Sequence, residues 1–171
     1  MRDRIWAELT QSKHSKEFLV LYSRRQRAIL RYFNIGILTF SAGGIMGWKI
    51  WEDLPLISCV VIAIISLIKL IQPHLIMSDK LLSNLDTIHK FYIEYYNNLE
   101  KLWYEYEAGR LSDQESSKRF FKLKESEGKI TQVISDTIRT TPEGLVKKAK
   151  THSDQYFKQI FNTSIYEQKN N

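Results

Sequence analysis

Two apolar stretches, YFNIGILTFSAGGIMGWKIW at residues 32–51 and LPLISCVVIAIISLIKLI at residues 54–71, dominate the sequence. At about 1.5 Å of rise per residue, a helix of roughly 20 residues crosses the ~30 Å hydrocarbon core of a bilayer, and both stretches approach that length. The second stretch has no charged residue and no polar face between Leu56 and Ile68. We therefore expect a membrane hairpin of two transmembrane helices rather than two core helices of a soluble protein.

The distribution of charge predicts the orientation of this hairpin. Residues 1–31 contain eight basic and three acidic side chains, whereas the link at residues 49–55 contains one lysine and two carboxylates. By the positive-inside rule, both termini should lie in the cytoplasm. We expect a multi-pass protein of the inner (plasma) membrane, in contact with membrane lipid.

The rest of the chain has the apolar spacing of amphipathic helices. A short first helix, a polar break at residues 10–15 and a longer helix should precede the first stretch. Beyond the second stretch, apolar residues advance in steps of three and four from Leu81 to Tyr106, and Gly109 marks the end of that helix. A capping box at residues 112–115 begins the next helix, which should fold back antiparallel, and Thr141-Pro142-Glu143 begins another.

The fold class that follows is an all-α membrane protein, a two-transmembrane helical hairpin with a cytoplasmic helical bundle or coiled-coil-like hairpin. No run of alternating residues bounded by turns predicts a strand. We expect a cytoplasmic pre-membrane segment at residues 1–31, the two-span hairpin at 32–72, a cytoplasmic helical region at 73–162 and a polar tail at 163–171.

Motifs for catalysis and for metal binding are absent from the sequence. There is no glycine-rich phosphate loop and no nucleophile elbow, and the carboxylates of Glu105 and Glu107, or of Glu125 and Glu127, are two residues apart and cannot share a helix face. Cys59 is the only cysteine, and the four histidines have spacings that match no metal-ligand motif. We predict no enzymatic activity, no cofactor and no metal.

The net charge of +6 alone would suggest nucleic-acid binding, but its distribution argues otherwise, because residues 1–31 contribute +5 and should face anionic lipid. We therefore predict no sequence-specific nucleic-acid binding. A nucleotide or oligonucleotide could still bind basic side chains after the second stretch. The alternative is a solvated charged face, since Glu125 and Glu127 lie among these residues. The candidates are Arg119, Lys122, Lys124 and Lys129.

Small and polar side chains form one face of the first apolar stretch. Such a face either packs against the second stretch of the same chain, or packs between subunits and lines a pore. Conduction would require an oligomer, because one hairpin cannot enclose a channel. The residues of this face are Asn34, Gly36, Thr39, Ser41, Gly43 and Gly47. We expect a homo-oligomer, most favourably a tetramer, held together by Leu81, Leu85, Tyr92, Leu99 and Leu102.

The chain has three parts in order. They are a basic helical segment (LVLYSRRQRAIL, residues 19–30), two closely spaced apolar stretches, and a helical hairpin at residues 81–138. In this order of parts the chain resembles the SLATT family, two-span bacterial effectors associated with SMODS nucleotidyltransferases and SLOG proteins in anti-phage (antiviral) defence. The resemblance implies an oligomeric pore or ion-channel effector that disrupts the membrane in abortive infection. It also implies gating through the cytoplasmic helices by a nucleotide from a partner nucleotidyltransferase, and it brings no catalytic residues. The alternative is a non-conducting membrane scaffold or partner subunit that binds another protein through its cytoplasmic helices.

Overall fold

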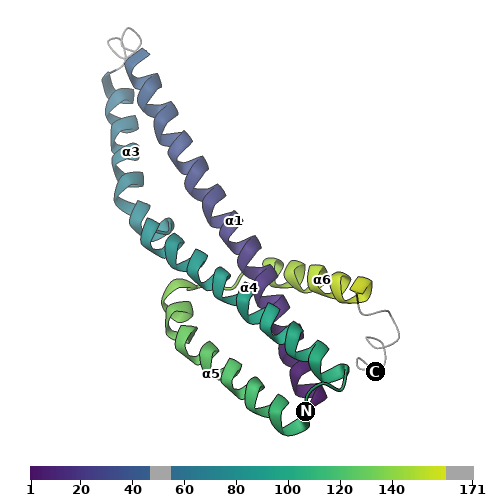
Figure 1. Cartoon of the computed structure of the whole chain (residues 1–171). Helices are drawn as coiled ribbons and strands as arrows, with labels where there is room; N and C mark the ends of the chain where they lie inside the picture. The colour runs from purple at the N-terminus through teal and green to yellow at the C-terminus, as the bar shows by residue number, and fades with distance from the viewer. Residues whose placement is uncertain (47–54, 161–171) are drawn as a thin grey trace. The chain divides into compact units, whose positions relative to one another are not determined.

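The computed structural model describes residues 1–46 and 55–160, without the side chains of residues 40–46, 55–58 and 73–75. Over these residues the chain is helical and contains no strand, which confirms the predicted all-α class. The helices are α1 (Arg2–Met46), α3 (Pro55–Leu75), α4 (Asp79–Glu107), α5 (Asp113–Thr137) and α6 (Glu143–Ile160) (Figure 1).

Helix α1 runs without a break through residues 10–15, so the predicted polar interruption is wrong. The Thr10 hydroxyl donates a hydrogen bond to the Trp6 carbonyl oxygen at 2.9 Å, and the Ser12 hydroxyl donates to the Leu9 carbonyl oxygen at 2.9 Å. These side chains satisfy their polar groups on the preceding turn of the same helix. They are therefore compatible with a continuous helix, although their type is more frequent at helix ends.

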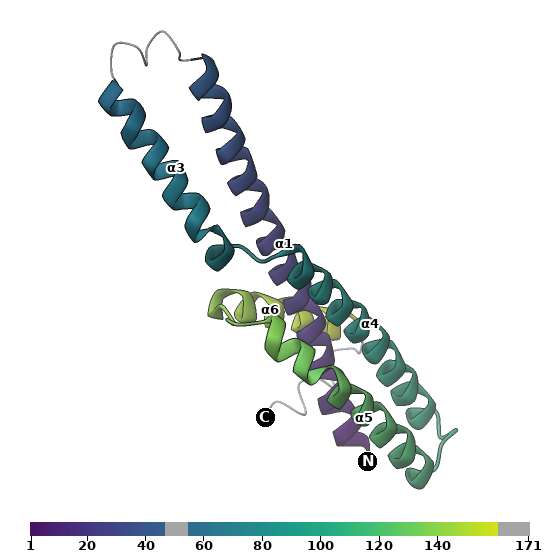
Figure 2. The same ribbon diagram turned by 90° about the vertical axis from the view of Figure 1, so that its left-hand side faces the viewer.

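The turn between α4 and α5 forms as its residues predict. Gly109 has a φ of 67°, the Arg110 amide donates to the Glu105 carbonyl, and the Gly109 amide donates to the Tyr106 carbonyl. This pair of bonds is a Schellman C-cap, which favours glycine at the left-handed position. The Ser112 side chain then accepts a hydrogen bond from the Glu115 amide and caps α5. The predicted antiparallel pairing of α4 and α5 is visible in both ribbon views (Figures 1 and 2).

The helices divide into two compact units. The unit that we call the bundle contains residues 1–23 of α1 together with α4 from Ser83 onward, α5 and α6. The unit that we call the helical pair contains residues 24–82, and therefore the rest of α1, all of α3 and the start of α4. In the bundle, large apolar side chains that are at most 2% exposed form the core, namely Ile5, Leu9, Leu19, Leu85, Ile88, Tyr95, Tyr96, Leu99 and Phe157.

Helix α6 lies across the part of α1 that belongs to the bundle (Figures 1 and 2). It buries Ala149, Ser153 and Phe157, which recur every four residues and so lie on one face. The Trp6 ring is 5.4 Å from the Phe157 ring and 4.9 Å from the Trp103 ring, measured between centroids. Trp6 therefore joins α6 to α4 through α1.

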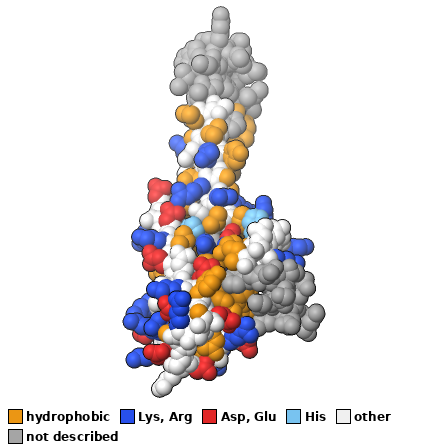
Figure 3. All heavy atoms as spheres, turned by 45° about the vertical axis from the view of Figure 1, so that its right-hand side comes forward, with side chains coloured by type: hydrophobic (Ala, Val, Ile, Leu, Met, Phe, Trp, Pro, Cys, Tyr) orange, Lys and Arg blue, Asp and Glu red, His pale blue; other side chains and the backbone are white. Residues whose placement is uncertain are grey.

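In the helical pair, α1 and α3 run antiparallel and leave apolar side chains at the surface (Figure 3). Val61, Ile65 and Gln72 are less exposed than their neighbours on α3, and their spacing of four and seven residues places them on one face. The other faces of α3 are exposed. Ile62 is 63% exposed and Leu70 is 74% exposed.

No helix combines enough length with enough apolar character to cross a membrane, within the residues that the structure describes. Helix α3 also contains the charged residue Lys69. This finding contradicts the predicted two-transmembrane hairpin and the transmembrane, ion-channel and pore-forming character attached to it. It likewise contradicts the multi-pass inner-membrane location with both termini in the cytoplasm.

Candidate functional site

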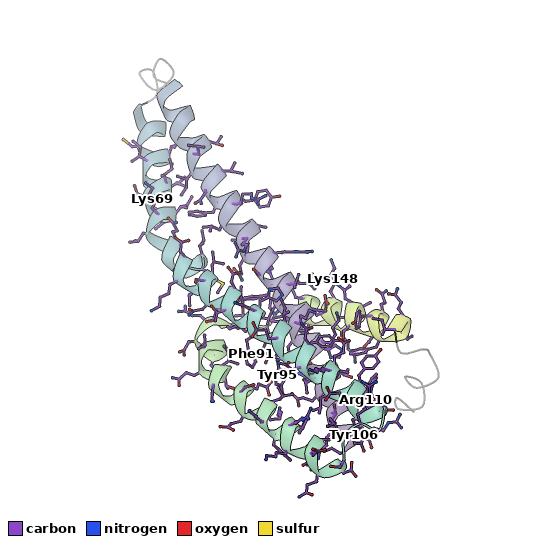
Figure 4. The ribbon with its side chains drawn as sticks, in the orientation of Figure 1. Lys69, Phe91, Tyr95, Tyr106, Arg110 and Lys148 are labelled. Carbon is purple, nitrogen blue, oxygen red and sulfur yellow. The ribbon has the colours of Figure 1, made fainter. Side chains whose placement is uncertain are left out.

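A groove of about 520 Å³ lies between α4 and α5 in the bundle. Phe91 and Tyr95 occupy successive turns of α4 (Figure 4), and their rings stack with centroids 5.5 Å apart and planes 18° apart. Tyr95 is buried, so these rings and the side chains of Leu102 and Leu123 give the groove an apolar floor. The polar lining consists of Glu94, Asn98, Lys101 and Glu105 from α4 and Arg119, Lys122 and Ser126 from α5.

Charges of both signs surround this groove. The Arg119 Nη1 lies 2.7 Å from the Glu105 Oε2, and the Lys101 Nζ lies 3.9 Å from the Glu105 Oε1. Glu105 thus offsets the two cations nearest to it, and Glu94 adds a second carboxylate to the lining. The groove is only weakly positive, which suits a ligand with charges of both signs better than a polyanion.

The four predicted ligand-binding cations do not gather at one place. Arg119 and Lys122 line the groove together, whereas Lys124 lies 3.0 Å from Glu8 and 2.7 Å from Glu127. Burial opposes the charge of Lys124, but its hydrogen bonds to the two carboxylates raise its pKa overall. Lys129 is exposed and does not line the groove. At most two of the four can therefore contact one ligand there.

The Glu8 carboxylate connects three helices of the bundle. The Tyr95 hydroxyl donates to the Glu8 Oε1 at 2.9 Å, and Lys124 of α5 pairs with the same carboxylate. On α5, Glu127 accepts from Lys124 and from the Tyr92 hydroxyl at 3.3 Å. Burial, followed by the charge of Glu127, raises the pKa of Tyr92 to about 12. These contacts hold α1, α4 and α5 in register, and no spacing in the sequence indicates them.

A second group of polar contacts joins α1, α4 and α6. Lys13 is buried, with its Nζ 2.9 Å from the Glu17 Oε1 and 3.8 Å from the centroid of the Tyr156 ring. The Tyr96 hydroxyl donates to the Glu100 Oε1 at 2.7 Å and lies 3.2 Å from the Tyr156 hydroxyl. Burial, and then these hydrogen bonds, raises the pKa of Tyr96. No pattern in the sequence indicates this cluster, because three separate helices contribute its residues.

The residues predicted to hold an oligomer together belong largely to the core of a single chain. Leu85, Tyr92, Leu99 and Leu102 are buried in the bundle. Leu81, which belongs to the helical pair, is half-buried. The apolar stripe of α4 is thus covered mostly by other helices of the same chain. The tetramer stays a prediction.

The small-residue face of the first apolar stretch is described only in part. Asn34 is exposed, and the exposed Thr39 hydroxyl donates to the Ile35 carbonyl oxygen of its own helix at 2.9 Å. A Cβ atom added at Gly36 would meet no other atom within 4 Å, so no neighbouring backbone approaches closely there. The surroundings of Ser41 and Gly43 in their helix are not described, and Gly47 lies outside the described residues.

No family model matches the chain, and neither a curated protein nor a solved structure matches it. The resemblance to the SLATT family therefore rests on the order of parts in the sequence and stays a prediction. In the part of the chain with described coordinates, no three His, Cys, Asp or Glu side chains are grouped so that they could hold a metal ion.

Proposed function

We propose that the protein is a self-associating scaffold. In this proposal, copies of the chain join through the apolar surface of the helical pair, while the bundle contacts a partner protein. The observation that carries the proposal is the apolar surface of α1 and α3. The most exposed large apolar side chains of the pair are Tyr32, Ile35, Leu38, Val60, Ile62, Ile64, Leu67 and Leu70, each between 49% and 74% exposed.

The extent of this surface supports association with a second copy. A helix that is apolar on most of its faces is normally covered, because exposed apolar area in water costs about 25 cal/mol per Å². Eight large apolar side chains of the pair are each at least 49% exposed, and each partner in a stable interface contributes roughly 800 Å² of surface. Lys69 is the only charged side chain in the described part of α3, so two copies that meet through this helix would bury little charge.

The bundle offers a different kind of surface. Its groove between α4 and α5 has an apolar floor formed by Tyr95 and Leu102 and a rim that contains both carboxylates and cations. A peptide segment with apolar and oppositely charged side chains matches that pattern, since interfaces combine an apolar centre with a polar rim. The bundle is therefore the part of the proposed scaffold that binds another protein.

Sedimentation velocity of the full chain in aqueous buffer tests the self-association. We expect the wild type to sediment as an oligomer, and the variants Ile62→Glu and Leu70→Glu to shift toward the monomer. Val146→Glu is the matched control, because Val146 is an exposed apolar residue of the bundle. A wild type that stays monomeric up to submillimolar concentration would contradict the proposal. A protein that stays monomeric in buffer but binds detergent micelles would also contradict the proposal, because detergent or lipid, and not a second copy, would then cover the apolar surface.

A nucleotide remains a second candidate ligand of the groove, because Arg119 and Lys122 lie there together. Phosphate groups bind fixed cationic donors, but the Arg119 Nη1 already forms an ion pair with the Glu105 Oε2 at 2.7 Å. Titration with ATP would test this candidate. We expect Lys122→Gln to weaken any binding and Lys129→Gln, outside the groove, to leave it unchanged.

A further inference from the structure

A second pocket, of about 460 Å³, lies in the bundle where four helices meet. Its lining comes from α1, α4, α6 and the end of α5, continued by residues of the segment that leads into α6. This volume falls in the range of roughly 300–1,000 Å³ that small-molecule sites occupy. The pocket is open to solvent beside α6, because one of its lining residues, Val146, is 47% exposed.

The floor of the pocket is apolar. Leu19, Ile88 and Ala149 are at most 2% exposed, and Phe18 is half-buried above them. Tyr92 contributes its ring, while its hydroxyl is hydrogen-bonded to Glu127 of α5. The floor can therefore hold a hydrocarbon chain and offers it little competition from polar groups.

The rim of the pocket is polar. None of the described residues that line it is an aspartate or a glutamate. Lys150 supplies an exposed ammonium group, and Gln11 and Thr141 supply exposed neutral polar groups. His14 also lines the pocket, but its Nε2 is buried and lies 3.5 Å from Asp154. Lys150 is thus the cation that a ligand can reach.

From this arrangement we propose that the pocket binds a long-chain monocarboxylate, with its alkyl chain on the apolar floor and its carboxylate at Lys150. A single negative charge matches a single accessible ammonium group. An alkyl chain of roughly 12 carbons fits the volume, and burying each methylene contributes about 0.8 kcal/mol. A polyphosphate does not suit the site, because it would leave most of its charge without a cationic partner.

Isothermal titration of the full chain with dodecanoate, below its micelle concentration, tests the proposal. We expect saturable binding at one site per chain. Lys150→Gln should weaken that binding roughly fivefold, because it removes the charge partner of the carboxylate and leaves the floor intact. Lys147→Gln is the matched control, since Lys147 is an exposed lysine of α6 outside the pocket. This variant should bind dodecanoate as tightly as the wild type does.

Two further measurements locate the ligand and its head group. Val146→Trp places an indole at the mouth of the pocket and should weaken dodecanoate binding about tenfold, while circular dichroism confirms that the helices are retained. Dodecanol should bind the wild type no more tightly than dodecanoate binds Lys150→Gln. Absence of saturable dodecanoate binding would overturn the proposal. Unchanged affinity in Val146→Trp would overturn the location, and equal affinity of Lys150→Gln and the wild type would overturn the assignment of the head group.

Discussion

The Lys13 ammonium group lies 3.8 Å from the centroid of the Tyr156 ring, although one residue is near the start of α1 and the other is in α6. Lys13 is only 6% exposed, and its Nζ is also 2.9 Å from the Glu17 Oε1. A desolvated cation over an aromatic face contributes about 1–2 kcal/mol. This contact, with the packing of Trp6 against Phe157 at 5.4 Å, holds α6 on the bundle.

Replacing Tyr156 separates the ring contact from the hydroxyl contacts. Tyr156→Leu removes both and should lower the free energy of unfolding by about 2–3 kcal/mol. Tyr156→Phe keeps the ring over Lys13 and loses only the hydroxyl contacts to Tyr96 and Glu100, so it should cost about 1 kcal/mol. Urea unfolding followed by circular dichroism measures both values. Equal losses in the two variants would show that the ring contact contributes nothing.

The ion pair between Lys124 and Glu8 predicts a position-dependent effect on α5. Lys124→Met leaves the Glu8 carboxylate, whose side chain is 15% exposed, without its cation and should lower the unfolding free energy by about 1–2 kcal/mol. Lys129→Met, on the exposed surface of the same helix, should change it by less than about 0.5 kcal/mol. If both variants unfold at the same urea concentration, Lys124 does not stabilise the contact of α5 with α1.

Leu99 is fully buried in the bundle, so its truncation should affect folding before assembly. Leu99→Ala should lower the free energy of unfolding of each chain by about 2–5 kcal/mol, because it leaves a cavity in the core of the bundle. Hydrogen exchange of the α4 amides measures this loss directly. A variant that keeps its wild-type protection but loses oligomer mass would instead place Leu99 at a surface between chains.

The end of α4 and the start of α5 could be predicted because their signals are local. Gly109 closes α4 with a positive φ, and Ser112 caps α5 with its own side chain, both within a few residues of the signal. The break expected at residues 10–15 was wrong. The hydroxyl groups of Thr10 and Ser12 donate hydrogen bonds within their own helix, and composition alone does not distinguish that outcome from a loop.

The partners of the apolar stripe on α4 could not be predicted from its spacing. A row of apolar residues indicates that a face is buried, but it does not say whether the cover is another chain or a distant part of the same chain. Here the first 23 residues supply part of the cover, with Ile5 and Leu9 fully buried. The weak net charge of the groove could not be predicted from the sequence either, because Arg119 and Glu105 form their ion pair only when α4 and α5 pack together.

The environment of His89 should make the stability of the bundle depend on pH. Burial, and then the charge of Lys16, lowers the pKa of His89 below its ordinary value of 6.5, while Asp86 and Glu17 oppose this shift. The unfolded chain therefore binds a proton more readily than the folded chain. The stability that neutral His89 provides is present above about pH 6.5 and is lost as the pH falls through the lowered pKa.

Replacing His89 should reduce this dependence. The unfolding free energy of the wild type should decline between about pH 7.5 and 5.5, and His89→Gln should decline less steeply over the same range. His152→Gln, at an exposed position of α6, is the control and should follow the wild type. Parallel curves for His89→Gln and the wild type would remove His89 as the origin of the decline.

Energy transfer between copies labelled at Cys59 tests the proposed self-association most directly. Cys59 is the only cysteine of the chain and is exposed on α3, so each copy carries one dye on the surface through which copies are proposed to join. Mixing donor-labelled and acceptor-labelled protein in aqueous buffer should produce transfer that increases with concentration and is lost in Ile62→Glu. Absence of transfer at every concentration, or transfer that Ile62→Glu leaves unchanged, would contradict the account.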